Sequence, residues 1–200
     1  VVGTAFTTKR GTSSLAVSAW RMLTKSLRPV PDEWFGLKDE DERYRKRYLD
    51  MLLTPALSDL VRKRSVFWNA VRDFMLERGF HEVETPVLET MTGGAEARPF
   101  TTHHNALDID VFLRISVELW HKKLMVAGIP KTFEIGRVFR NEGMSNEHAQ
   151  DYTHFEFYEA YQDARTGVPM LIDMYRTVAQ KTFGTLQFTI GEFSVDLGEE

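Results

Sequence analysis

Residues 133–161 gather charged and aromatic side chains in a pattern that could support chemistry, FEIGRVFRNEGMSNEHAQDYTHFEFYEAY. Alternating polar and apolar residues predict two β-strands, and the polar stretch between them, residues 141–151, is too long for a two-residue turn. Successive side chains of a strand point to opposite faces of a sheet. If the polar faces of both strands lie on the same side, one surface collects Arg140, Glu142, Tyr152, Glu156 and Tyr158.

These residue types suit a ligand that carries both phosphate and amine groups. An arginine grips phosphate with two parallel hydrogen bonds, paired carboxylates suit an ammonium group, and a tyrosine ring offers a stacking surface for a base. A solvated sheet face whose charges cancel would show the same pattern, so the pattern alone leaves both interpretations open. Arg140 and Glu156 are the hardest to explain without a ligand, because charges within aromatic strands are costly unless they are paired.

Three sequence blocks carry a resemblance to a known family. Phe139–Glu142, with the sequence FRNE, resembles motif 2 of the class II aminoacyl-tRNA synthetases. His148 in the loop and the closing EFYEAY narrow the resemblance to the lysyl-tRNA synthetases. Residues 79–108 resemble class II motif 1 followed by a stretch similar to the lysyl subgroup, and LRISVELW places Glu118 at the start of a helix, as in that family.

The resemblance implies a lysine-tRNA ligase, in which lysine reacts with ATP to form lysyl-adenylate and the lysyl group then passes to tRNA(Lys). It also implies the roles of individual residues. Arg140 would be catalytic at the α-phosphate. ATP would be bound by Arg140, Glu142, His148 and Tyr152, and lysine by Gly94, Glu118, Glu156 and Tyr158. Plainer interpretations stay open, because His148 can be an ordinary loop residue, Glu118 a favourable helix N-terminal residue and Gly94 a simple turn.

The implied fold is α+β, a class II synthetase-like antiparallel sheet flanked by helices and preceded by a partial OB-fold β segment. We expect residues 1–28 to be the C-terminal part of an OB-fold anticodon-binding domain, 29–42 a linker, and 43–200 the N-terminal part of the catalytic domain. Motif 3 and the acidic Mg²⁺ ligands of the family are not found. The chain is therefore interpreted as a fragment that is inactive alone, with its magnesium ligands expected in a C-terminal part.

Two long helices are predicted. The first spans residues 58–78, is capped by Ser58 or Asp59 and ends at Gly79. Its apolar side holds Val61, Phe67, Ala70, Val71, Phe74 and Met75. The resemblance implies that this helix and the following strand form a homodimer interface, whereas an ordinary helix packed on its own sheet would look the same. The second spans residues 163–186 and is expected to be interrupted near Gly167 and Pro169. Its mixed core candidates are Met170, Ile172, Met174, Tyr175 and Val178.

Composition and charge agree with an enzyme that works in the cytoplasm. The chain is 42% hydrophobic and 27% charged, has no cysteine, and lacks both a signal-peptide layout and an apolar run near the roughly 20 residues that a membrane span needs. The net charge of −4 is unevenly spread: residues 1–50 hold 10 basic and 7 acidic residues, and the other 150 hold 15 and 22. The basic run that begins at Arg43 either contacts tRNA phosphates or forms an amphipathic helix, and we favour the helix. The His103–His104 pair has no matching carboxylate spacing for a metal site.

Two further interpretations stay open. One is a lysyl-transferring paralogue that acts on a protein acceptor, although the OB-like start argues against it. The other is a non-catalytic module for nucleic-acid binding or dimerisation. A GxxxxGK[ST] loop is not found, which argues against a P-loop ATPase.

Overall fold

The computed structural model describes residues 1–30, 37–145 and 147–199, which divide into two compact units. One unit is Val1–Asp59 and the other is Leu60–Glu200, and each is described by itself. Residues 31–36 of the expected linker 29–42 lie outside the described residues. The expected domain boundaries therefore stay a prediction.

The first unit opens with a β-hairpin. Strands β1 (Val2–Thr7) and β2 (Ser13–Ala19) pair antiparallel, and a turn over residues 8–12 joins them. Gly11 occupies the left-handed region at φ 81°, which a residue without Cβ adopts at no steric cost. These β segments were predicted, whereas their assignment to an OB-fold stays a prediction.

Two short helices follow, α1 (Glu40–Arg45) and α2 (Arg47–Leu53). Helix α1 begins inside the last three residues of the expected linker, because the Asp39 carboxylate caps it by accepting a hydrogen bond from the backbone N of Glu42 at 2.7 Å. The side chain of Asp50 is 3% exposed and pairs with Arg43 at 3.2 Å and Arg47 at 3.0 Å. Two arginines of the basic run therefore have a structural partner, whereas Tyr44 and Tyr48 of the same run are exposed, so the choice between a packed amphipathic helix and a tRNA contact stays a prediction.

Helix α3 (Pro55–Glu77) starts three residues earlier than predicted, so neither Ser58 nor Asp59 is its cap. Proline suits the first helical position, because its fixed φ is already helical and its missing N–H would have no partner there. The predicted end is confirmed: Gly79 has φ 78°, and its N–H donates to the carbonyl of Leu76 at 3.0 Å.

The apolar side of α3 is only partly buried. Ala70, Val71, Phe74 and Met75 are in the core, as predicted. Val61 and Phe67 are not, with 50% and 36% of their surface exposed. The core contacts of α3 are thus confined to its C-terminal half. The periodicity correctly identified the apolar side of the helix but not how much of that side is buried against the rest of the protein.

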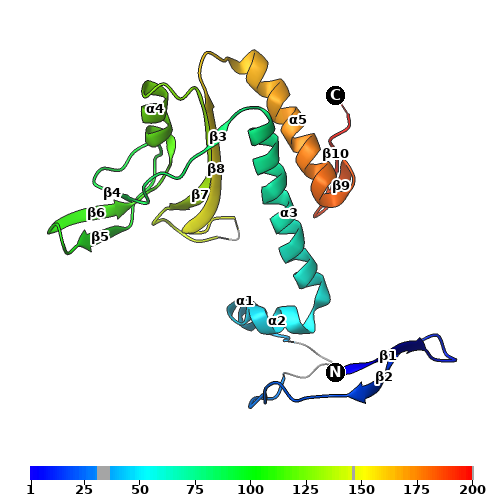
Figure 1. Ribbon diagram of the computed structural model, residues 1–200. Coiled ribbons are helices and arrows are strands. Elements are labelled where there is room, and N and C mark those ends of the chain that lie inside the picture. Colours follow the sequence, from blue (N-terminus) through cyan, green and yellow to red (C-terminus); the bar gives the residue numbers. More distant parts are fainter. Residues whose placement is uncertain (31–36, 146, 200) are drawn as a thin grey trace. The chain divides into compact units, whose positions relative to one another are not determined.

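The central sheet has the strand order β3–β7–β8, with β3 (His81–Glu82) parallel to β7 (Lys131–Phe139) and β7 antiparallel to β8 (Asp151–Glu159). Helices α3 and α5 lie side by side on one face of this sheet (Figure 1). The buried core between them and the sheet consists of Ala70, Val71, Phe74, Met75, Phe80, Phe133, Met174 and Val178. This mixed architecture confirms the predicted α+β class.

Helix α5 (Ala164–Phe183) runs without the interruption expected near Gly167 and Pro169. Asp163 caps it, its carboxylate accepting from the backbone N of Arg165 at 2.9 Å, and Thr166 completes a capping box. Pro169 removes one N–H in the second turn, a local loss offset by this cap and by burial of the next turns. Of the core candidates, Met174 and Val178 are buried and Met170 packs on the core, whereas Ile172 and Tyr175 are exposed.

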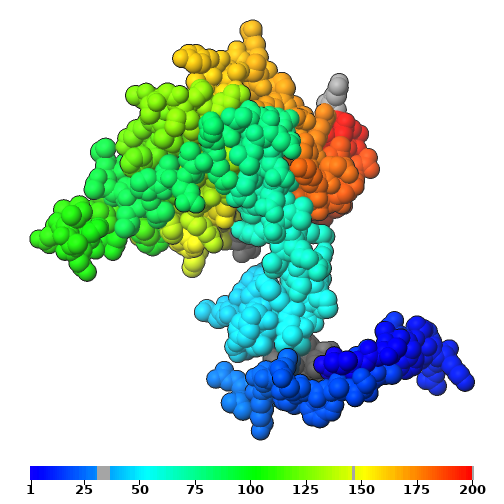
Figure 2. All heavy atoms as spheres, in the orientation of Figure 1, coloured from blue at the N-terminus to red at the C-terminus, as the bar shows by residue number. Residues whose placement is uncertain are grey.

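A second, smaller sheet and helix α4 (Glu118–Val126) lie on the other side of the central sheet from α3 and α5 (Figure 1). Strands β4 (Leu88–Glu89), β5 (Thr101–His104) and β6 (Ile109–Leu113) form a sheet of order β4–β6–β5. Helix α4 follows it, and in the segment between β6 and α4 the carbonyl of Arg114 accepts from the backbone N of Phe139, at the end of β7, at 2.9 Å. The tip of the β5–β6 hairpin projects as a lobe of the second unit (Figure 2). Strands β9 (Gln187–Ile190) and β10 (Phe193–Asp196) pair antiparallel as a hairpin.

Candidate functional site

The register of β7 and β8 brings their polar faces to one side. Cross-strand pairs include Thr132 with Tyr158, Glu134 with Glu156, and Val138 with Tyr152. Residues directly opposite each other in an antiparallel ladder share a face. The expectation that one surface collects the polar residues of both arms is therefore confirmed, while the aromatic residues Phe133, Phe155 and Phe157 turn to the α3–α5 core.

At the loop end of the hairpin, the four residues predicted to bind ATP border a single cavity of about 320 Å³. It is lined by Arg140, Glu142, Gly143, Glu147, His148, Ala149 and Tyr152. The guanidinium carbon of Arg140 lies 5.7 Å from the centre of the Tyr152 ring, and its Nε donates to the carbonyl of Ile115 at 3.4 Å. Within the described part of the chain, no carboxylate forms an ion pair with Arg140. Its positive charge is thus available to an anion in the cavity.

The loop residue His148 is held in place locally. Its Nδ1 lies 2.7 Å from Oγ of Ser145, and the backbone N of Ser145 donates to the His148 carbonyl at 3.2 Å. Gln150 ties the loop to the strand end, because its side-chain amide donates to the Glu142 carbonyl at 3.1 Å. These contacts keep the imidazole beside the cavity that Arg140 borders.

The residues predicted to bind lysine meet farther along the same face. Oε1 of Glu156 accepts from Oγ of Ser116 at 3.3 Å, and the same oxygen of Ser116 accepts from the backbone N of Glu118 at 3.1 Å. Gly94 packs against this group at φ 83°, and a Cβ there would lie 2.9 Å from Cβ of Glu118. Only glycine allows this approach without strain.

Tyr158 completes the acidic end of the site. Its hydroxyl donates to Oε2 of Glu156 at 2.6 Å. Burial raises the pKa of the Tyr158 phenol far above its ordinary value, and the hydrogen bond to Glu156 and the negative charges of Glu156 and Glu118 raise it further. The phenol therefore stays protonated at any physiological pH and can donate a hydrogen bond to Glu156. A cavity of about 490 Å³ along β8 is bordered by Glu118, Glu156 and Tyr158, together with apolar residues of β8 and α5.

A buried ion pair lies beneath the two ends of the site. Nη1 of Arg114 donates to Oε1 of Glu134 at 2.5 Å, and the two side chains are 3% and 4% exposed. Thr85 donates to Oε2 of Glu134 from its backbone N at 3.2 Å and its hydroxyl at 2.7 Å. Gly136 of β7 is the cross-strand partner of His154 on β8. A Cβ at Gly136 would lie 2.3 Å from Nη2 of Arg114. Glycine therefore makes room for the guanidinium.

Several residues of this face escaped the sequence analysis. Arg114, Ser116 and His121 come from the segment before the hairpin and the first turns of α4, which the alternation of the strands cannot reveal. His154 lies on the strand face, with Nδ1 3.3 Å from Oε1 of Glu156. Its alternation with Tyr152 and Glu156 was the signal that could have identified it. Burial lowers the pKa of His154, and the charge of Glu156 acts in the opposite direction.

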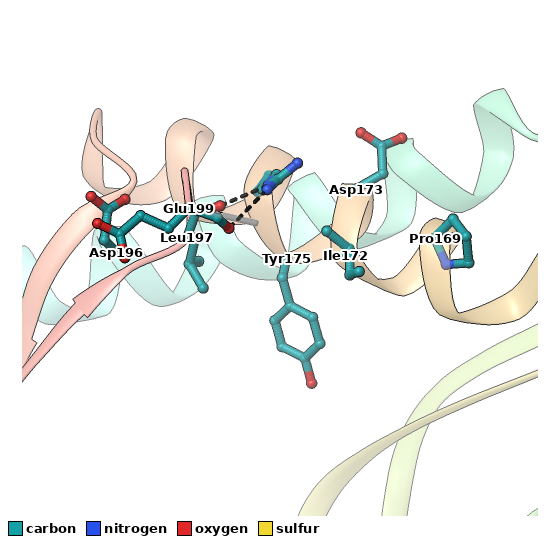
Figure 3. Close-up of a pocket in the computed structure, with 8 residues that line it drawn as sticks. Pro169, Ile172, Asp173, Tyr175, Asp196, Leu197 and Glu199 are labelled. Carbon is teal, nitrogen blue, oxygen red and sulfur yellow. Dashed lines mark hydrogen bonds between the residues drawn. The ribbon is translucent and has the colours of Figure 1, made fainter.

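A third cavity, of about 580 Å³, lies away from this face, between α5 and the segment after β10 (Figure 3). Arg176 pins that segment by donating to the carbonyls of Leu197 at 2.6 Å and Glu199 at 3.2 Å. None of the predicted site residues borders it. Across residues 1–30, 37–145 and 147–199, no group of three or more His, Asp or Glu side chains is placed to hold a metal ion, and no helix there is long and apolar enough to cross a membrane.

Comparison with known proteins matches the chain to one family. Residues 39–197 fit the family described as tRNA synthetases class II (D, K and N). The chain is 46% identical over 197 residues to a lysine–tRNA ligase of Thermoanaerobacter sp. (strain X514), covering 98% of this chain and 40% of that protein. It is also 46% identical over 197 residues to the heat-inducible lysine–tRNA ligase of Escherichia coli (strain K12), covering 98% of the chain and 39% of that protein.

A lysine–tRNA ligase of Synechococcus sp. (strain CC9311) is likewise 46% identical over 190 residues, covering 95% of the chain and 39% of that protein. The chain thus spans about two fifths of the length of the relatives it matches. The matched span contains α1 to α5 and both ends of the site. The chain belongs to the family of class II tRNA synthetases for aspartate, lysine and asparagine.

Proposed function

We propose that this chain is part of a lysine-tRNA ligase and carries the motif 2 half of its adenylation site. One observation supports this most strongly: the cavity at Arg140 and Tyr152 and the carboxylate of Glu156 lie on the same face of one hairpin, where Ser116 links Glu156 to Glu118 of α4. An adenylate-forming site needs these two chemistries side by side, because the carboxylate of the amino acid must reach the α-phosphorus of ATP.

In the proposed first step, a carboxylate oxygen of lysine bonds to the α-phosphorus while the bond to the β-phosphate oxygen breaks and pyrophosphate leaves. Negative charge builds on the α-phosphoryl oxygens, and a fixed guanidinium there stabilises the transition state more than the ground state. Arg140 has this role, because it carries an available charge at the edge of the cavity. Tyr152 stacks on adenine, and Glu142 and His148 hold the rest of the nucleotide.

The acidic end suits a substrate with two ammonium groups. Glu118 and Glu156 provide one carboxylate for each, and the Tyr158 hydroxyl orients Glu156. In the second step, a terminal ribose hydroxyl of tRNA(Lys) attacks the lysyl carbonyl carbon, loses its proton and displaces AMP. A carboxylate nucleophile is already ionised at neutral pH, so the first step needs no general base.

Further features of the proposed protein follow from its family. It uses ATP and Mg²⁺, works in the cytoplasm and forms a homodimer. The described residues offer no clustered ligand set for magnesium, and no step above depends on one. The exposed apolar residues of α3, Val61 and Phe67 among them, support a partner surface on that helix.

Pyrophosphate exchange in the full-length protein that contains this sequence tests the proposal. We expect lysine-dependent exchange with little activity on arginine or ornithine, and a loss of about 100-fold or more in Arg140→Ala. Arg137→Ala is the matched control: Arg137 lies on the opposite face of the same strand, exposed and paired with Asp151 at 3.1 Å. Its exchange rate should change less than twofold.

Several results would contradict parts of the proposal. Activation of another amino acid would refute the substrate, and full activity of Arg140→Ala would remove the role of that arginine. Exchange followed by transfer to a protein instead of tRNA(Lys) would identify the protein-modifying paralogue. Absence of any exchange would favour a non-catalytic binding or dimerisation module.

A further inference from the structure

The ring of His121 lies buried beneath the acidic end of the site, and the adenylation steps described above give it no role. His121 is one turn after Glu118 on α4, so both side chains leave the helix on the same side. None of its surface is exposed. Burying a histidine costs free energy unless both ring nitrogens have hydrogen-bond partners, so a buried histidine without them calls for an explanation.

The polar contacts of His121 define how the ring is held. Nδ1 lies 2.7 Å from Oγ1 of Thr132. Nε2 has no hydrogen-bond partner among the described residues, and its nearest carboxylate oxygen, Oε2 of Glu134, is 3.8 Å away. A proton on Nε2 faces that negative charge, which favours the tautomer in which Nδ1 accepts from the Thr132 hydroxyl. Burial lowers the pKa of His121, so the ring is neutral at physiological pH, with Glu134 and Glu156 acting against this shift.

The ring of Tyr158 stacks on the face of the His121 ring. The two rings are stacked, with centres 4.9 Å apart and planes inclined by 21°. Thr132 and Tyr158 are cross-strand partners in the β7–β8 ladder, so one position of the sheet supplies both the hydroxyl that holds His121 and the ring that rests on it. The Tyr158 hydroxyl in turn donates to Glu156 at 2.6 Å. Thr132, His121, Tyr158 and Glu156 thus form one continuous chain of contacts.

The neighbouring charges explain why this chain matters for Glu156. Glu134 is the cross-strand partner of Glu156, and two carboxylates opposite each other repel. Arg114 neutralises Glu134 by forming a buried ion pair with it. Of the two facing carboxylates, Glu156 is therefore the one that has no buried guanidinium partner. Its orientation then depends on Ser116, on the hydroxyl of Tyr158 and on His154, whose Nδ1 lies 3.3 Å from Oε1 of Glu156.

We propose that His121 is a positioning residue for the amino-acid end of the site: its ring, held by Thr132, fixes the Tyr158 ring and thereby directs the hydroxyl onto Glu156. His121 touches no substrate. Before the substrate binds, it already holds the Glu156 carboxylate in the orientation that binds an ammonium group. This inference rests on the proposed role of Glu156 and Tyr158 in binding lysine.

A double-mutant cycle in the full-length protein tests it, with lysine-dependent pyrophosphate exchange as the assay. Tyr158→Phe removes a hydrogen bond to a charged group, so we expect a rise of at least about tenfold in KM for lysine. His121→Leu should raise the same KM about tenfold and change KM for ATP less than twofold. The double variant should be no worse than Tyr158→Phe alone, because both changes remove the same contact. His121→Phe, which keeps a ring to stack on, should recover part of the loss.

A packing role of His121 predicts different results. Trp120→Phe is the control for general weakening of α4, because the Trp120 Nε1–H bonds to Oε1 of Glu89 at 2.7 Å on another side of that helix. It should lower the unfolding midpoint without changing KM for lysine. The inference would be overturned if the rise in KM for lysine in the double variant equalled the product of the rises in His121→Leu and Tyr158→Phe. An equal rise in KM for lysine and for ATP in His121→Leu would also overturn it.

A measurement that does not need activity separates this inference from the proposed function. In protein labelled with ¹³C in its tyrosine rings, Tyr158→Phe identifies the Tyr158 signals. These signals should shift in His121→Leu and stay in place in Trp120→Phe. Unshifted Tyr158 signals refute the positioning role whether or not the protein activates lysine, whereas shifted signals without lysine activation refute only the proposed function.

Discussion

Removal of the Glu134 carboxylate should be among the most damaging single changes to the stability of this chain. Glu134 accepts three hydrogen bonds, one from Arg114 and two from Thr85, and is the counter-charge of a guanidinium that is 3% exposed. In Glu134→Ala, Arg114 keeps the carbonyls of Arg137 and Thr85 as acceptors but has no negative partner. Breaking a buried pair in this way costs about 3–5 kcal/mol.

That loss is large against a total stability of about 5–15 kcal/mol for a domain. It corresponds to a fall of roughly 6–20 °C in Tm, at about 2–4 °C per kcal/mol for a protein of this size. Urea unfolding followed by circular dichroism, with linear extrapolation, measures the free energy directly. Glu134→Gln keeps the shape and one acceptor and should fall between Glu134→Ala and the unmodified chain.

The matched control is Glu82→Ala on the neighbouring strand β3. Glu82 pairs with Arg72 at 2.8 Å, but the two side chains are 32% and 35% exposed, and such surface pairs contribute no more than about 1 kcal/mol. The combined change Arg114→Met with Glu134→Leu should be less destabilising than Glu134→Ala, because it leaves no unpaired charge. The reasoning fails if Glu134→Ala costs no more than Glu82→Ala.

Three further predictions concern the same face. Gly136→Ala would place Cβ 2.3 Å from Nη2 of Arg114, so we expect a loss of roughly 1–3 kcal/mol in urea unfolding, and an unchanged midpoint would contradict the packing described here. Gly94→Ala forces alanine to φ 83° and against Glu118, so KM for lysine in pyrophosphate exchange should rise, and equal KM values would remove Gly94 from the site. Burial holds the pKa of His121 below its ordinary 6.5, so the unfolded chain binds more protons than the folded chain below that pH. The free energy of unfolding should therefore fall as pH drops from 7.5 to 5.5, by at most about 1.4 kcal/mol per pH unit for this group. In urea unfolding, His121→Leu should make this dependence on pH less steep. An equal slope in both proteins would show that His121 is not the cause.

Local rules predicted much of the fold, because they depend on neighbours in the chain. The alternation of residues 133–161 was sufficient to assign which side chains of β7 and β8 share a face. Gly79 ended α3 where a left-handed residue was needed. Where a local rule was read alone it went wrong: Pro169 did not break α5, since the cost of one missing hydrogen bond is small beside the burial of the turns that follow.

The faces of the helices show where local rules stop. Periodicity placed Val61 and Phe67 with Phe74 on one apolar side of α3, but only the C-terminal half of the helix packs on the sheet. Periodicity reports which residues would be buried together. It contains no information on how far the covering layer extends, which depends on elements distant in sequence.

By itself, the sequence determined the residue types of the site and their order along the hairpin, because strand periodicity places Arg140, Tyr152 and Glu156 on one side once the two arms pair. Only the tertiary structure decided what lies beneath them. The pair of Arg114 and Glu134 and the stack of His121 on Tyr158 join segments that are far apart in the chain. Such contacts arise when separate elements are packed together and buried charges must find partners, and no spacing within a single strand or helix encodes that choice.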